Sequence, residues 1–205
     1  MKKSILMLFA AVVSACCWSC GATDKGANAD SATEAGITVD QALSNPDSLV
    51  GDTIVIEGVV SHLCRQGGRK AFVAGEGDNA MLRCEAYPLM GEPFAKEAVS
   101  RPIKVRGVFR EERIDEAAIV EMEKQNAIRL QNIAAESGEE SAERASDAES
   151  GCDTERAAQG QAELTTFNER MADYRAKIAE REANEGKPYL SYYYLDALSY
   201  EIPEE

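Results

Sequence analysis

The stretch TIVIEGVVSHLC, residues 53–64, alternates between two sets of side chains with a period of two, which is typical of a β-strand. This alternation puts one set on a single face of the strand, namely Ile54, Ile56, Gly58, Val60, His62 and Cys64. Residues 66–69, QGGR, form a turn sequence, and residues 70–74 resume the strand pattern. The sequence therefore predicts a β-hairpin over residues 53–74.

Three further segments have the same period. Residues 79–87 and 101–111 alternate, the second with Ile103, Val105 and Phe109 opposite Lys104, Arg106 and Arg110. A fifth alternating segment follows only at residues 189–202. Together with short helices expected after the Thr38-x-x-Gln41 capping box and over 92–99, these strands predict an α+β domain over residues 38–205. Its core would be an OB-like (oligonucleotide/oligosaccharide-binding) five-stranded β-barrel.

The long segment between the fourth and fifth predicted strands has helical patterns. Residues 115–136 carry an apolar stripe, and residues 164–181 carry a cleaner one with the spacing of a coiled coil: Leu164, Phe167, Met171, Tyr174 and Ile178. Residues 136–160 between them are acidic and serine-rich, which predicts a disordered linker. We expect a helical hairpin inserted between strands 4 and 5 over residues 114–186.

The N-terminus has the pattern of an export signal over residues 1–20, with two lysines before a short apolar run. Val13-Ser14-Ala15 before Cys16 resembles a bacterial lipobox, so lipidation is expected at Cys16, with Cys20 as the alternative. An ordinary secretory signal with chance cysteines is the simpler interpretation. Residues 21–37 are small and polar and predict a flexible tether. The expected location is the cell envelope, on the inner or outer membrane of a Gram-negative bacterium, held by the lipid without spanning the bilayer.

Several runs resemble a family of uncharacterised OB-fold envelope lipoproteins from anaerobic Gram-negative bacteria. They are GDTIVIEGVVSHLCRQGGRKAFV (51–73), REERIDEA (110–117), GCDTE (151–155) and YRAKIAEREANEGKPYLSYYYLDALSYEI (174–202). The resemblance implies the barrel fold and the envelope location, but it lends no activity. The family's hairpin is richer in histidine, and Gln66 stands here in place of its second histidine.

The only histidine and the cysteines of the folded part suggest a metal or redox site. His62 and Cys64 share a predicted strand face, and imidazole and thiolate are ligands of soft metals such as zinc or copper(I). Cys84 on the third strand is a candidate third ligand, and Cys152 in the acidic linker is a fourth. The simpler interpretation is that Cys84 is a small core residue and His62 a packing residue. A Cys64–Cys84 disulfide is a further alternative.

A second candidate site combines cations with tyrosines. Arg69 and Lys70 follow the glycine turn, and Tyr192, Tyr194 and Tyr200 lie along the last predicted strand. OB folds use exposed aromatic side chains to stack rings of their ligands, although these tyrosines could equally cover the barrel–hairpin junction. The formal net charge of −14 disfavours nucleic acid, and an exported location favours a glycan, peptide or envelope-protein partner.

The sequence contains no recognisable nucleophile–base–acid set and no HExxH motif. We therefore expect a non-enzymatic, lipid-anchored envelope protein whose OB-like domain is a binding or interaction module. The alternative is a thiol/metal-binding or redox-handling envelope protein that uses His62, Cys64 and Cys84.

Overall fold

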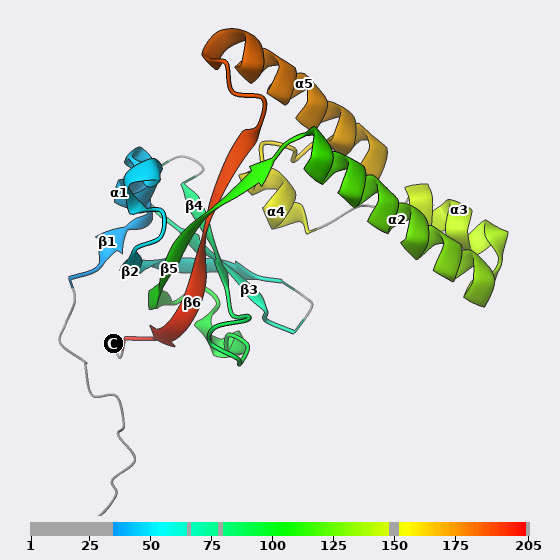
Figure 1. The fold of residues 1–205 in the computed structure, drawn as a ribbon. Helices are drawn as coiled ribbons and strands as arrows, with labels where there is room; N and C mark the ends of the chain where they lie inside the picture. The colour runs from blue at the N-terminus through cyan, green and yellow to red at the C-terminus, as the bar shows by residue number, and fades with distance from the viewer. Residues whose placement is uncertain (1–34, 65–66, 78–79, 148–151, 204–205) are drawn as a thin grey trace, which may run out of the picture. The chain divides into compact units, whose positions relative to one another are not determined.

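Five strands close into a mixed β-barrel in the computed structural model (Figure 1). They are β2 (Thr53–Leu63), β3 (Lys70–Ala74), β4 (Met81–Glu85), β5 (Pro102–Ile114) and β6 (Leu190–Glu201). Around the barrel the order is β2-β3-β4-β6-β5, and β5 pairs back with β2. Only the β4–β6 pair within this circle is parallel. The domain is thus an α+β barrel compatible with an OB-like fold.

The structure describes residues 35–64, 67–77, 80–147 and 152–203. The predicted signal peptide, with Cys16 and Cys20, and the predicted tether up to residue 34 lie outside these residues. Within the described ranges, no helix is long and apolar enough to cross a membrane.

The chain enters the barrel through short elements. The two-residue strand β1 (Ile37–Thr38) pairs in parallel with β2 and leads into α1 (Val39–Ser44) and the 3-10 turn η1 (Pro46–Leu49). The predicted capping box is confirmed: the Gln41 amide donates to Thr38 Oγ1 and the Thr38 amide donates to Gln41 Oε1. The helix predicted over 92–99 is instead a single 3-10 turn, η2 (Lys96–Ala98). Pro93 disfavours helical backbone at Glu92, where the predicted helix would begin.

Side chains from all five strands fill the barrel. The fully buried ones include Ile56, Val60, Val73, Leu82, Cys84, Ile103, Val105, Phe109, Leu195 and Ala197. The predicted faces of β5 are confirmed, because Ile103, Val105 and Phe109 point into this core. Two register shifts break the simple alternation elsewhere, one at Ser61 in β2 and one at Leu198 in β6.

The described residues between β5 and β6 form four helices. They are α2 (Glu116–Ser137), α3 (Glu139–Asp147), α4 (Asp153–Ala158) and α5 (Phe167–Glu185). The segment therefore holds more than one helix pair, and the stretch 136–160, predicted to be disordered, contains α3 and α4. The composition predicted disorder because an acidic segment with few apolar side chains cannot bury enough apolar surface to fold by itself. Here α3 packs on α2, and α4 is held by the barrel.

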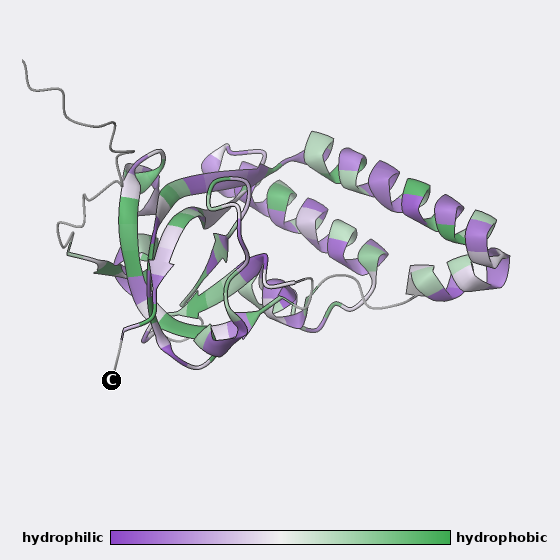
Figure 2. Ribbon diagram, turned by 90° about the horizontal axis from the view of Figure 1, so that it is seen from below, coloured by the Kyte–Doolittle hydropathy of each residue, from purple (hydrophilic) through white to green (hydrophobic). Residues whose placement is uncertain are grey.

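A second apolar cluster joins α2 and α5 to the strands. Its buried members are Ile114, Ile119, Met171, Tyr174 and Ile178. The predicted stripe of α5 is thus confirmed from Phe167 onward, whereas Leu164 precedes the helix, which begins after the Thr166 cap. Apolar and polar residues alternate along both long helices (Figure 2). Helix α5 buries Met171, Tyr174 and Ile178 on one side, whereas Ile119 is the one buried residue of α2, so the predicted stripe of α2 is buried only at its start.

Candidate ligand-binding site

The β-bulge at Ser61 decides where the residues of the SHLC stretch point. Because β2 gains one residue relative to β3 there, Leu63 packs against the barrel core in register with Ala71, which in turn pairs with Cys84. His62 and Cys64 then lie on the outer face of the barrel. They share a face as predicted, but Cys84 points to the opposite side of the sheet.

Cys84 therefore does not belong to the predicted metal or redox set. Its side chain is 0% exposed, and burial raises the pKa of its thiol to about 12, so it stays protonated at neutral pH. A Cys64–Cys84 disulfide is also excluded, because the two side chains lie on opposite faces of one sheet. Over the described part of the chain, no three His, Cys, Asp or Glu side chains are arranged to hold a metal ion. The simpler interpretation of Cys84, a small core residue, is the one that the structure supports.

Cys152 does approach the hairpin. Its Sγ lies 3.3 Å from His62 Nε2, and the His62 ring also contacts that of Phe72 with centroids 6.0 Å apart. Cys152 is the residue that precedes α4, so this contact ties the start of α4 to the outer face of β2. Cys64, Cys84 and Cys152 are all free thiols.

A charged contact holds α4 to the next strands. Glu155 Oε1 accepts from Lys70 Nζ at 2.9 Å and from Arg83 Nη1 at 3.1 Å. Burial alone would raise the pKa of Glu155, but the two cations outweigh it and hold that pKa below its usual value. The carboxylate is therefore charged at neutral pH and bridges β3 and β4.

Arg83 is the centre of this cluster, with a side chain only 12% exposed. Besides Glu155, it donates to Glu112 Oε2 at 2.7 Å, and its guanidinium lies 4.8 Å above the ring of Tyr194. Its Nε is 2.9 Å from Glu85 Oε1, but the angle is too poor for a hydrogen bond, so this contact is an ion pair alone. One arginine thus compensates three carboxylates from β4, β5 and α4.

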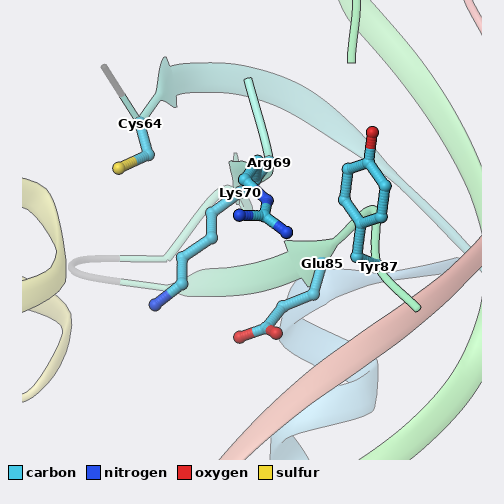
Figure 3. Close-up of a pocket in the computed structure, with 5 residues that line it drawn as sticks. All are labelled: Cys64, Arg69, Lys70, Glu85 and Tyr87. Atoms are coloured by element: carbon cyan, nitrogen blue, oxygen red, sulfur yellow. The ribbon is translucent and has the colours of Figure 1, made fainter. Parts of the chain in front are cut away.

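Beside this cluster lies a cavity of about 240 Å³ lined by Cys64, Arg69, Lys70, Glu85 and Tyr87 (Figure 3). The Arg69 guanidinium lies 4.8 Å from the centre of the Tyr87 ring, whereas the Lys70 amine points away from that ring (Figure 3). No carboxylate of the described residues forms an ion pair with Arg69, although Lys70 and Glu85 are both paired. Arg69 is therefore the cation of this cavity that is free to meet a ligand.

The turn that presents Arg69 depends on glycine. Gly68 has φ +68°, and a Cβ on it would lie 2.7 Å from the carbonyl oxygen of Phe94. Its own carbonyl accepts from the Phe94 amide at 2.9 Å, which fixes the end of the turn against the barrel. The predicted glycine turn thus positions Arg69 and Lys70 at the cavity.

The three tyrosines of the predicted ligand face do not share a face. The bulge at Leu198 turns Tyr200 toward the barrel core, where its ring contacts that of Phe94 at a tilt and its hydroxyl accepts from the Ala95 amide. Tyr192 packs in the second apolar cluster, as the alternative interpretation expected. Tyr194 lies under Arg83. The predicted tyrosine face is therefore wrong, and the aromatic ring that lines the cavity is that of Tyr87.

Arg83, Glu85, Tyr87 and Glu155 were absent from the predicted sites. The β4 sequence MLRCE offered one signal, since its alternation puts Arg83 and Glu85 on the face opposite the buried Leu82 and Cys84. Nothing in the sequence indicated that Glu155 would meet Arg83.

Fold and site together define an α+β barrel protein with a small, partly charged cavity on its outer surface. No protein-family model matches the chain, and no curated protein does. One solved structure similar to part of it is a candidate aspartyl-tRNA synthetase from Leishmania major Friedlin, with 16% sequence identity and a TM-score of 0.26. The match covers 42% of this chain and 17% of the synthetase, so the chain spans only a small part of that protein's length.

Proposed function

We propose that this protein is a non-catalytic binding module whose barrel takes a carboxylate-bearing ligand, of the kind found at a peptide C-terminus, in the cavity beside Arg69. The observation that carries the proposal is the exposed Arg69 guanidinium, stacked over Tyr87 and without an ion pair among the described residues. A planar guanidinium suits a carboxylate because it can donate two parallel hydrogen bonds.

The remaining lining of the cavity fits the same ligand class. Tyr87 offers an apolar ring surface for a side chain, and Glu85 has further acceptor capacity for a peptide N–H. A volume of about 240 Å³ is below that of drug-sized pockets and suits a single residue or sugar ring. The sequence suggests glycan or peptide partners, and Arg69 favours an acidic partner among them.

The test compares short N-acetylated peptides that have a free C-terminal carboxylate with their C-terminal amides, by isothermal titration or NMR line shifts on the full chain. We expect the peptides with a free carboxylate to bind. Arg69→Ala should weaken their affinity about tenfold or more, because it removes at least one charge-assisted hydrogen bond. Arg129→Ala is the control, since Arg129 is in α2 and its hydrogen bonds within the described part of the chain go to Asn126 and Ala145. Equal binding of acids and amides, or equal loss in both variants, would rule out this ligand class.

We also propose that the barrel is of the OB-like class, with α2 and α5 as the hairpin of an expanded connection between its fourth and fifth strands. Contacts between α2 and α5, together with the cluster around Ile119 and Tyr174, support this assignment. The strand order with one parallel pair supports the barrel class.

The anchoring proposal rests on the lipobox-like sequence. We propose that the chain is held in a Gram-negative cell envelope by a lipid on Cys16. Cells fed an alkyne-tagged fatty acid are expected to label the wild-type chain and Cys20→Ser, but not Cys16→Ser. If labelling were lost only in Cys20→Ser, the lipidated residue would be Cys20. If the wild-type chain were not labelled, the N-terminus would be an ordinary secretory signal without a lipid.

A further inference from the structure

Helix α4 is attached to the β2–β3 hairpin at two points that flank Cys64. The first is the contact of 3.3 Å between Cys152 Sγ and His62 Nε2, and the second is the ion pair of 2.9 Å between Glu155 and Lys70. His62 precedes Cys64 by two residues on the same face, and Lys70 is its cross-strand neighbour, with its carbonyl accepting from the Cys64 amide at 2.9 Å. Cys64 therefore lies between the two residues that contact α4.

Both thiols are partly exposed, and the Cys152 sulfur lies against His62, two residues from Cys64. Cys64 and Cys152 are both half-buried, in contrast to the fully buried Cys84. In Figure 3 the Cys64 sulfur points to the same side as the Lys70 amine, toward the segment in pale yellow, the colour of α4 in Figure 1. Among the described cysteines, only this pair shares the outer face of the barrel.

We propose that Cys64 and Cys152 form an intramolecular disulfide by exchange with a small-molecule disulfide, and that this bond fastens α4 to the β2–β3 hairpin. The proposal is independent of the carboxylate ligand. Because Cys64 lines the cavity, the same bond changes one wall of that site.

The exchange needs no oxidant other than the small disulfide. His62 takes the proton of the Cys152 thiol, and the thiolate attacks one sulfur of the small disulfide, whose S–S bond breaks. The departing thiolate takes a proton from His62 and leaves as one thiol. Cys64, losing its proton, then attacks the mixed disulfide at the Cys152 sulfur and releases the second small thiol. The Cys64 proton goes to the second departing small thiolate, so the protein loses two protons and two electrons in all, and the two small thiols carry them away.

The experiment treats the reduced full chain with glutathione disulfide and locates the products by peptide mapping, which separates this pair from Cys16, Cys17 and Cys20. The expected product is a Cys64–Cys152 cross-linked peptide, with Cys84 still a free thiol. Cys64→Ser is expected to stop at a glutathione adduct on Cys152, and Cys84→Ser is the matched control that should cross-link like the wild type.

A rate measurement tests the part played by His62. His62→Ala is expected to slow the first adduct on Cys152 about tenfold near neutral pH, because it removes the imidazole that lies 3.3 Å from the Cys152 sulfur and takes its proton. In the wild type, Cys64→Ser and His62→Ala, protection of Cys84 reports that the barrel is folded. Glutathione on both cysteines without a cross-link, a cross-link to Cys84 in the folded chain, or no reaction at Cys152 would each overturn the proposal.

Discussion

Replacing Arg83 with alanine is expected to lower the free energy of unfolding by about 3 kcal/mol and to detach α4 from the barrel. The side chain is only 12% exposed and contacts Glu85, Glu112 and Glu155, so its removal leaves three carboxylates close together with one cation fewer. Lys70 remains as the partner of Glu155, but it reaches neither of the others by an observed ion pair. Urea unfolding measures the loss, and amide hydrogen exchange over residues 153–158 measures the detachment of α4.

Arg144→Ala is the matched control, because Arg144 makes an ion pair of 3.4 Å with Glu140 and both side chains are more than 70% exposed. An exposed pair of this kind contributes about 0.5 kcal/mol or less. If both variants lost the same small amount of stability, the charged cluster would have no role in holding α4.

Tyr174→Ala is expected to lower the free energy of unfolding by about 3–5 kcal/mol, the range for truncating a large core side chain. Tyr174 is 1% exposed and lies at the centre of the cluster that joins α2 and α5 to the strands. Its ring meets that of Tyr192 edge-on, with centroids 6.2 Å apart. The alanine variant therefore leaves a cavity at this junction. Chemical unfolding monitored by circular dichroism measures the loss in the free energy of unfolding.

Tyr174→Phe keeps the ring and removes only the hydroxyl, which donates to Gln159 Oε1 at 2.8 Å and accepts from Arg170 Nη2 at 3.4 Å. These two hydrogen bonds together are expected to contribute about 1–2 kcal/mol. A phenylalanine variant as unstable as the alanine variant would place the stabilisation in the hydroxyl network instead of in the packing of the ring.

Most of the barrel could be predicted because each strand carries its own period. In β5, Ile103, Val105 and Phe109 face the core as their spacing required, and β6 appears within one residue of its predicted limits, 189–202. The Thr38 capping box likewise acts over only three residues, so neighbouring side chains specify it.

The candidate site was less predictable because it depends on register and on long-range contacts. The extra residue at Ser61 separates His62 and Cys64 from Cys84, and the one at Leu198 separates Tyr200 from Tyr194. A strand pattern is read along one chain, whereas a bulge exists only relative to the partner strand. Arg69 and Lys70 were found because the glycine turn that carries them is local.

The sequence by itself determined the strands, the main helical segments and the turn that carries Arg69, since these follow from periodicity, capping and glycine conformation within a few residues. Only the tertiary structure decided that α4 folds on the barrel. The α4 segment has no apolar stripe from which its packing on the barrel could be predicted. Helix α4 is held there by the contacts of Glu155 with Lys70 and Arg83, which are 85 and 72 positions away in the chain. Such a contact stabilises only after the barrel has brought its cations together.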